Sequence, residues 1–506
     1  MKSFALTWIA GASLAALAAA PASADTLQEA LIKAYQSNPT ITGARAGLRA
    51  QDENVPIARA EGLPGADTRA QYTETLRQQG NNIFAPDRQI NGSATVSYPI
   101  ISFGAVRNSV RAARTRVEAG RANLRGTEAN LFTDVVAAYM DVIRDEAIVS
   151  LNRQNVRVLE VNLQASRDRF EVGDLTRTDV AQSEARRALA EGQLRQAEAR
   201  LIASRETYVQ LVGTPPGVLE APPPLPNLPK DPGSAVTTAL DNNPLIDAAE
   251  RARDASRLDV SVARASRLPR INVQAGGSYY NFLNTLGSSS PISNVLQSDY
   301  GFTAGFGVIV PLYQGGRPGA QVRQAQARQS QAIEQLTETE RGIIAQARAA
   351  FANWQSAQQV IASSQVAVDA NRLSLEGVRA ENSVGTRTIL DILNAEQELL
   401  NSQVTLATAR RDAYVAGFAL LAAMGRAEAR DLGLEGGPLY DPVVNYDRVR
   451  RKLSDWSSDP EPQPVGTRTA DTPAQTPVVG PNPLLNDPAL QRPVDTNPAN
   501  PAGVRR

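Results

Sequence analysis

The chain has 506 residues, and its 52 Lys and Arg side chains balance its 52 Asp and Glu side chains. Because neither sign is in excess, the composition favours neither a nucleic-acid-binding protein nor an acidic disordered chain. Histidine and cysteine are both absent, which excludes His general bases, Cys nucleophiles and the commonest zinc and iron–sulfur ligands. We therefore expect no enzyme, no cofactor and no metal site.

The N-terminus predicts an exported protein. Lys2 precedes an apolar run over residues 4–20, and Ala22-Ser23-Ala24 forms a small-x-small cleavage signal. Residues 1–24 are interpreted as a signal peptide, with a retained membrane anchor as the alternative. No later stretch reaches the roughly 18–20 apolar residues of a spanning helix, so a form embedded in a membrane would have to be a β-barrel.

Paired motifs divide the chain into two similar halves. Asn38-Pro39 recurs as Asn243-Pro244, and Tyr98-Pro99 recurs as Val310-Pro311. These matches predict two structural repeats. The expected boundaries are 25–213 for the first repeat, 214–232 for a proline-rich linker and 233–426 for the second repeat. Each repeat is expected to begin with helices that the Asn-Pro pair interrupts, at 26–37 and 40–62 and again at 234–241 and 245–267.

Four segments have the alternation of β-strands. The predicted strands lie at about 67–77, 92–100, 270–280 and 300–310, and the first of them is polar on both faces. The clearest is the last, in which Tyr300, Phe302 and Phe306 alternate with Gly301, Thr303 and Gly305. Each segment is about as long as a tilted membrane strand, which needs roughly 9–11 residues. A soluble hairpin with one apolar face is the alternative.

The longest predicted elements follow the strands. An apolar residue recurs every seventh position from Val110 to Phe170, with one skip of four residues, and the same register returns 212 residues later. Each series predicts a supercoiled helix roughly 100 Å long. Shorter return helices are expected at 177–212 and 389–424. These patterns alone also fit an elongated soluble coiled coil.

The C-terminal part differs from both repeats. Residues 427–454 are expected to pack on the equatorial region, midway along the helical body. From 455 to 506 the chain is rich in proline and poor in aromatic residues, which predicts a disordered tail.

Each long helix and its return helix meet at a short turn, here called a tip. Gly173 and Gly385 suit the left-handed conformation that ends a helix. Thr176 and Thr388 are natural N-caps, and Asp179 and Asp391 stand where a capping-box acid reaches back. This chemistry is that of a well-made αα-turn. It leaves Arg387 unexplained, because the aligned residue of the first tip is Leu175.

With these features the sequence resembles the TolC family of trimeric outer-membrane efflux ducts, over the mature chain to about residue 430. The specific marks are the duplicated halves, strand-proline-long helix in each, and Val-Gly-Thr-Arg-Thr-Ile-Leu-Asp-Ile-Leu at residues 384–393. The resemblance implies a mixed membrane β-barrel and α-helical coiled-coil barrel. Three chains would each give four strands to one 12-stranded barrel above a periplasmic helical tunnel, with strand-to-helix turns at Pro99 and Pro311.

The resemblance also assigns roles to the tips. Asp391 takes the position of a family aspartate that narrows the periplasmic entrance, and Asn394 replaces a second one. Arg387 would lock the closed entrance through Thr178 and Asp179, while Asn382 replaces a tyrosine that supports this lock in the family.

The function expected from the resemblance is a passive exit duct in the outer membrane. The sequence has no Walker loop, so energy would come from an inner-membrane pump of the ABC or RND type, and a periplasmic adaptor would engage the tips. The expected partners are two further copies of the chain, the adaptor, the pump and outer-membrane lipid, with no nucleic acid. The alternative is a periplasmic or secreted coiled-coil structural protein without a pore.

Overall fold

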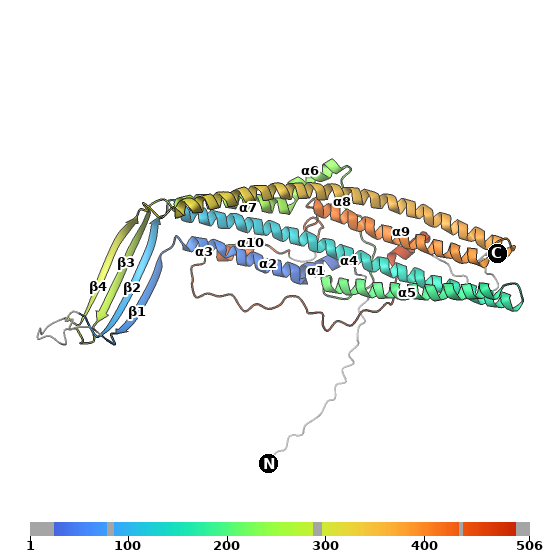
Figure 1. The fold of residues 1–506 in the computed structure, drawn as a ribbon, viewed down its shortest axis with the longest axis horizontal. Helices are drawn as coiled ribbons and strands as arrows, with labels where there is room; N and C mark the ends of the chain where they lie inside the picture. The colour runs from blue at the N-terminus through green and yellow to red at the C-terminus, as the bar shows by residue number, and fades with distance from the viewer. Residues whose placement is uncertain (1–24, 78–84, 287–295, 435–438, 492–506) are drawn as a thin grey trace, which may run out of the picture.

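The computed structural model describes residues 25–77, 85–286, 296–434 and 439–491. The predicted signal peptide lies outside the described residues. Figure 1 shows an elongated molecule with a β-sheet at one end and two helical tips at the other. Long helices run the whole distance between them, which matches the length predicted from the heptad series.

One antiparallel sheet holds all the described strands, in the order β1-β2-β3-β4. The strands span β1 Gly65–Glu74, β2 Arg88–Ile101, β3 Arg270–Asn281 and β4 Ser298–Ile309. Strand β2 pairs with β3, so the sheet joins the two halves of the chain. All four predicted strands therefore belong to a single sheet.

The register gives this sheet one polar and one apolar face, since side chains alternate along each strand. The polar face carries Asp67, Arg69, Gln71, Asn91, Ser93, Thr95, Ser97, Asn272, Gln274, Ser278 and Thr303. The apolar face carries Ala66, Ala70, Tyr72, Ala94, Val96, Tyr98, Ile271, Val273, Ala275, Tyr279, Tyr300, Phe302, Phe306 and Val308. Strand β1, whose sequence shows no clear apolar face, gains one from its pairing with β2.

The helices repeat one plan in each half. The first half contains α1 Leu27–Ser37, α2 Pro39–Asp52, α3 Asn54–Ala60, α4 Ala105–Glu171 and α5 Arg177–Val212. The second contains α6 Pro232–Asn242, α7 Pro244–Ala265, α8 Arg317–Ser383 and α9 Ile389–Ala423, followed by the short α10 Val443–Val449. Helices α4 and α8 have 67 residues each. Among the helices of the described ranges, none has the length and hydropathy needed to span a membrane.

The two long helices are buried to very different extents. The heptad residues Val117, Leu124 and Leu131 of α4 are buried, as are Val322 and Leu336 of α8. Outside the heptad positions, α4 is covered over most of its length, whereas much of α8 faces solvent. Helix α8 therefore leaves a large surface free in the single chain.

The Asn-Pro motifs join helices that are distant in sequence. Asn38 caps α2 by accepting from the Thr40 N–H, and its side-chain nitrogen donates to the Leu211 carbonyl at 2.8 Å. Asn243 caps α7 in the same way and donates to the Ala423 carbonyl at 3.0 Å. Both acceptors lie in the last turn of a return helix, where carbonyls lack a helical partner. Helices α4 and α5 form one helical hairpin, and α8 and α9 form the other. Each Asn-Pro motif thus joins the start of a short helix to the end of one helical hairpin.

The strand-to-helix turns lie a few residues beyond the two prolines predicted to make them. Pro99 is inside β2, where the register shifts before Ile101, because proline has no N–H to donate to the ladder. The chain turns at Gly104, with φ 87°, and at Gly316, with φ 80°. Pro311 lies between the end of β4 and the second of these turns. The prolines end the sheet pairing, and the glycines make the turns.

Residues 439–449 pack against the first helices, and Figure 1 shows α10 beside α3, toward the sheet end of the helical body. The Arg45 guanidinium lies 4.2 Å from the Tyr35 ring centre and 5.0 Å from that of Tyr440. Asn445 donates to the Asp52 carboxylate at 2.7 Å. These contacts hold the chain after α9 against α1 and α2.

The prediction of a disordered tail does not hold for residues 482–491. They form two short 3-10 helices, η1 Pro483–Asn486 and η2 Pro488–Leu490, and the Leu490 side chain is fully buried. The Asn482 side chain donates to the Ile143 carbonyl of α4 at 2.7 Å, and the Gln403 side chain of α9 donates to the Ala489 carbonyl at 2.9 Å. Composition predicted disorder for this segment because it is rich in proline. A few leucines and long-range hydrogen bonds are nevertheless enough to hold it against the helices.

We expect Leu490→Ala to lower the free energy of unfolding by about 2–4 kcal/mol, because it empties a fully buried site between the two hairpins. Thermal unfolding of the purified protein measures this change. Leu453→Ala is the matched control, since Leu453 is 68% exposed. Equal unfolding temperatures for the two variants would show that the tail contributes nothing to stability.

Candidate functional site

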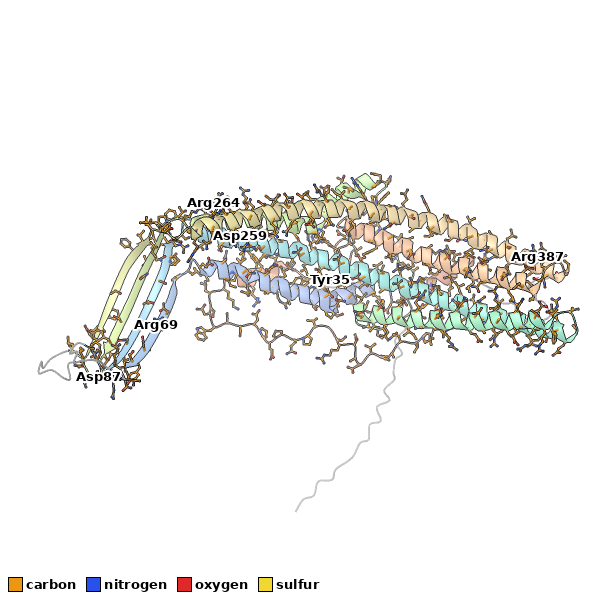
Figure 2. All side chains as sticks on the ribbon, viewed as in Figure 1. Tyr35, Arg69, Asp87, Asp259, Arg264 and Arg387 are labelled. Carbon is orange, nitrogen blue, oxygen red and sulfur yellow. The ribbon has the colours of Figure 1, made fainter. Side chains whose placement is uncertain are left out.

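The two helical tips lie together at the end of the molecule opposite the sheet, where Figure 2 labels Arg387. Helix α4 meets α5 at the first tip, and α8 meets α9 at the second. Gly173 and Gly385 have φ values of 84° and 82°, the left-handed conformation predicted for both. A side chain with a Cβ would be strained at either position.

Both predicted capping boxes are present. The Thr388 N–H and hydroxyl donate to Asp391 Oδ2 at 3.0 and 2.8 Å, and the Asp391 N–H donates back to the hydroxyl at 3.3 Å. Thr176 and Asp179 make the same three bonds in the first tip. The bonds from Thr388, first from its backbone and then from its hydroxyl, hold the pKa of Asp391 below its ordinary value. Asp391 is therefore ionised at neutral pH.

The second tip contains two contacts that the first tip cannot make. The Arg387 guanidinium donates to the Glu381 carboxylate at 2.7 Å, and this ion pair raises the pKa of Arg387. The Asn382 side chain donates to the Arg387 carbonyl at 2.7 Å. Within the described chain, no hydrogen bond joins Arg387 to Thr178 or Asp179. Asn382 thus supports the turn that carries Arg387, and Glu381 is a tip residue that sequence reasoning missed.

A direct link between the two hairpins lies just below the tips. The Arg186 guanidinium of α5 donates to Asn394 Oδ1 of α9 at 2.6 Å. Asn394 lies one turn beyond Asp391 on the same helix, as the sequence predicted. Arg186 has no distinguishing sequence context, because it is one of many charged residues on the exposed face of α5. Its role is visible only in the folded chain, where the two helical hairpins come close enough for Arg186 to reach Asn394.

Two equivalent ion pairs brace the hairpins behind the tips. Arg167 of α4 pairs with Glu184 of α5 at 2.7 Å, and Arg379 of α8 pairs with Glu396 of α9. The corresponding residues are 212 positions apart. Glu184 is half exposed, whereas Glu396 is fully buried, so the ion pair of the second hairpin is the better shielded from solvent.

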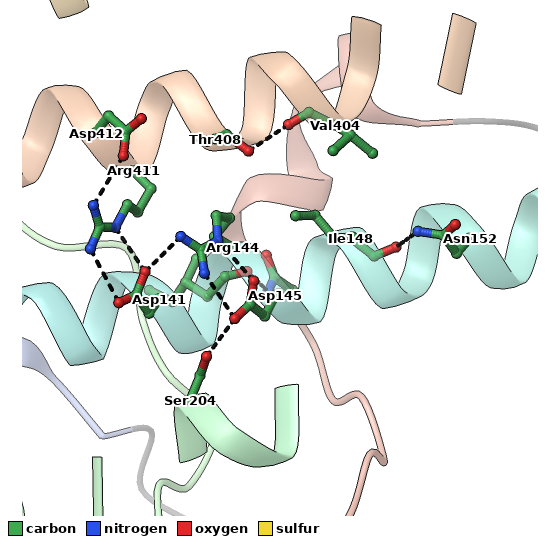
Figure 3. A network of polar contacts seen from close by, with 12 residues as sticks. Asp141, Arg144, Asp145, Ile148, Asn152, Ser204, Val404, Thr408, Arg411 and Asp412 are labelled. Atoms are coloured by element: carbon green, nitrogen blue, oxygen red, sulfur yellow. Dashed lines mark hydrogen bonds and ion pairs between the residues drawn. The ribbon is translucent and has the colours of Figure 1, made fainter. Parts of the chain in front are cut away.

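A second link between the two hairpins, shown in Figure 3, lies nearer the middle of the body. Arg411 of α9 pairs with Asp141 of α4 at 2.8 Å, and Asp141 also pairs with Arg144 at 2.7 Å. Arg144 in turn binds the buried Asp145 at 2.8 Å, and Asp145 accepts from Ser204 of α5. The network connects three long helices. In the described parts of the chain, no group of acidic side chains has the arrangement of a metal site.

We expect Arg186 and Asn394 to be coupled by about 0.5–1 kcal/mol, as for an exposed charge-assisted contact. Thermal unfolding of Arg186→Ala, Asn394→Ala and the double variant measures this coupling. Arg195→Ala combined with Asn394→Ala is the control, because Arg195 pairs with Glu198 of its own helix. Additive effects of Arg186→Ala and Asn394→Ala would show that the contact does not join the hairpins.

Comparisons with known proteins agree with this geometry. The family model described as "Outer membrane efflux protein" matches twice, over residues 30–214 and 235–426. The solved structure of the Campylobacter jejuni CmeC outer membrane channel has a TM-score of 0.69 and 15% sequence identity, over 85% of this chain and 90% of that chain. At this identity the likeness concerns the fold alone.

Relatives of known name are also similar over most of their length. The outer membrane efflux protein BepC of Brucella suis biovar 1 (strain 1330) is 34% identical over 434 residues, 85% of this chain and 91% of that protein. The outer membrane protein TolC of Escherichia coli (strain K12) is 25% identical over 473 residues, 88% of this chain and 93% of that protein. With its paired tips, two-faced sheet and double match, the chain belongs to the outer membrane efflux protein family.

Proposed function

We propose that the chain is the outer-membrane exit duct of a tripartite export system, which conducts substrates passively from the periplasm to the outside. Three copies assemble, each gives four strands to a 12-stranded barrel, and the helices form a tunnel in the periplasm. The two matches of the family model support two repeats in each chain. The observation that carries the proposal is a sheet with one polar and one apolar face, joined directly to helices roughly 100 Å long.

The apolar face of the sheet supports contact with lipid. Phe302 is 83% exposed and Phe306 is 77% exposed, although both side chains lie among other apolar residues. A soluble protein rarely leaves such a face uncovered. In a closed barrel this face meets lipid and the polar face lines the lumen, as in known membrane barrels.

The free edges of the sheet and the exposed surface of α8 support the proposal that further copies of the chain close the barrel and the tunnel. Strands β1 and β4 each have one edge without a partner strand in the described chain. Unpaired edge groups are costly in a membrane, and pairing β4 of one copy with β1 of the next removes every edge. On α8, Val366 and Leu373 are 68% and 70% exposed, one heptad apart, and would pack on a neighbouring copy.

The tips act as the gate in this proposal. Asp391 and Asn394 form the periplasmic constriction, and Arg387 locks it by binding Thr178 and Asp179 of a neighbouring copy, with Asn382 supporting its turn. Because Arg387 is half exposed and bonds Glu381 through one nitrogen, its other donors are free for such a partner. A periplasmic adaptor engages the tips, and an inner-membrane pump of the ABC or RND type supplies the energy.

The duct is tested by location and conductance. We expect the protein to fractionate with the outer membrane, to need detergent for extraction, and to give discrete conductance steps in planar lipid bilayers. Recovery in the soluble periplasm without detergent would instead support the coiled-coil structural protein, which makes no pore. The exposed aromatic face of the sheet favours the duct.

We expect Arg387→Ser to raise single-channel conductance severalfold, because exposed ionic links contribute only about 0–1 kcal/mol each and a closed state held by a few of them is readily opened. Single-channel recording in planar bilayers measures the change. Glu381→Gln is the control, since it removes the pair within the tip and leaves Arg387 able to bind Thr178 and Asp179. Equal conductance of the two variants, or no change in either, would contradict the lock.

A further inference from the structure

A cavity of about 920 Å³ lies where the sheet meets the long helices. Its walls include Arg270 and Asn272 of β3, Arg116 of α4, Asp259 of α7 and Arg328 of α8. Figure 2 labels Asp259 at this end of the helical body. The cavity is far from the tips and takes no part in the gate.

The cavity opens on the polar face of the sheet. Asn272 pairs with Pro99, which also lines the cavity, and both belong to the polar rows of their strands. Arg270 has the same parity as Asn272 and Gln274, so the three side chains share that face. In the proposed duct the polar face lines the lumen. The inference below rests on that assignment.

The arginines of this cavity are incompletely neutralised. Arg116 forms an ion pair with Asp259. Arg270 and Arg328 are exposed, and within the described ranges the guanidinium group of neither has an ion-pair or hydrogen-bond partner. The remaining acid among the lining residues is Glu61. Three guanidinium groups and two carboxylates leave one net positive charge on each chain.

The sequence segments around the cavity are also positively charged. Residues 101–117 contain four arginines and no acid, and residues 312–333 contain three arginines and no acid, in a chain whose total charge is zero. Neither α4 nor α8 has an acidic residue in its first turn, although a helix N-terminus is stabilised by acids. Helix stability therefore does not account for these arginines.

We propose that this cavity is an anion-binding vestibule in the lumen of the duct, and that it binds the carboxylate or phosphate groups of anionic cargo in transit. Guanidinium groups bind these groups through two parallel hydrogen bonds. Arg270 and Arg328 make the contact, and Asp259 positions Arg116 beside them. Three copies arrange the cavities as a ring around the lumen, and a ring of one charge sign sets the ion preference of a pore.

The test compares ion selectivity in planar bilayers under a tenfold KCl gradient. We expect the double variant Arg270→Gln/Arg328→Gln to shift the reversal potential toward cation preference, and the citrate concentration for half-block of the KCl current to rise at least threefold. Arg264→Gln/Arg267→Gln is the matched control, because it also removes two positive charges near the same junction, from exposed residues outside the cavity lining. The tip carboxylates are identical in all the channels compared.

Unchanged selectivity and unchanged citrate block in the double variant would overturn the vestibule. Absence of conductance from the unmodified protein would instead overturn the proposed duct. If the double variant does not assemble, Arg270→Lys/Arg328→Lys decides, because lysine keeps the charge but loses the bidentate geometry. Retained anion preference with weaker citrate block supports the vestibule, and failure of this variant to assemble would assign the arginines to contacts between copies.

Discussion

The polar network of Asp141, Arg144, Asp145 and Arg411 fixes how the two long hairpins lie against each other. Asp145 is buried, and a buried carboxylate is tolerated only when charged and hydrogen-bonding partners surround it. A slip of one helical turn between α4 and α9 would separate Arg411 from Asp141 and leave charges without partners. Since α4 and α8 are of equal length, this register also brings the two tips to the same end of the molecule.

The tips differ in the groups that can reach beyond their own turn. Both tips have a glycine in the left-handed conformation and the same capping box, so the turn itself is built in the same way in each. The first tip has Leu175 where the second has Arg387, so at this position of the turn only the second tip has a charged donor. Asp391 caps its own helix and remains ionised, while Asn394 is used to contact α5. This difference between the two tips is the basis on which we propose that they form a gate.

The two ends of the proposed duct carry opposite charge. The tips present the Asp391 carboxylate, and the junction below the sheet presents Arg270 and Arg328. A solute moving outward meets the acidic group first and the basic cavity afterwards. Because the field of an exposed charge is screened over about 8 Å in physiological salt, the two sites act separately along a body roughly 100 Å long.

The sequence by itself determined the elements whose signals are local. Heptad spacing set the long helices, alternation set the strands, and the Thr-x-x-Asp pattern set both caps, because these depend on neighbours within one or two turns. Only the tertiary structure decided contacts between distant segments. Asn38 bonds Leu211, Arg186 bonds Asn394, and Leu490 fills a site between hairpins. Local patterns marked Asn38 and Asn394 but not their partners, since each contact joins segments that only the folded chain brings near.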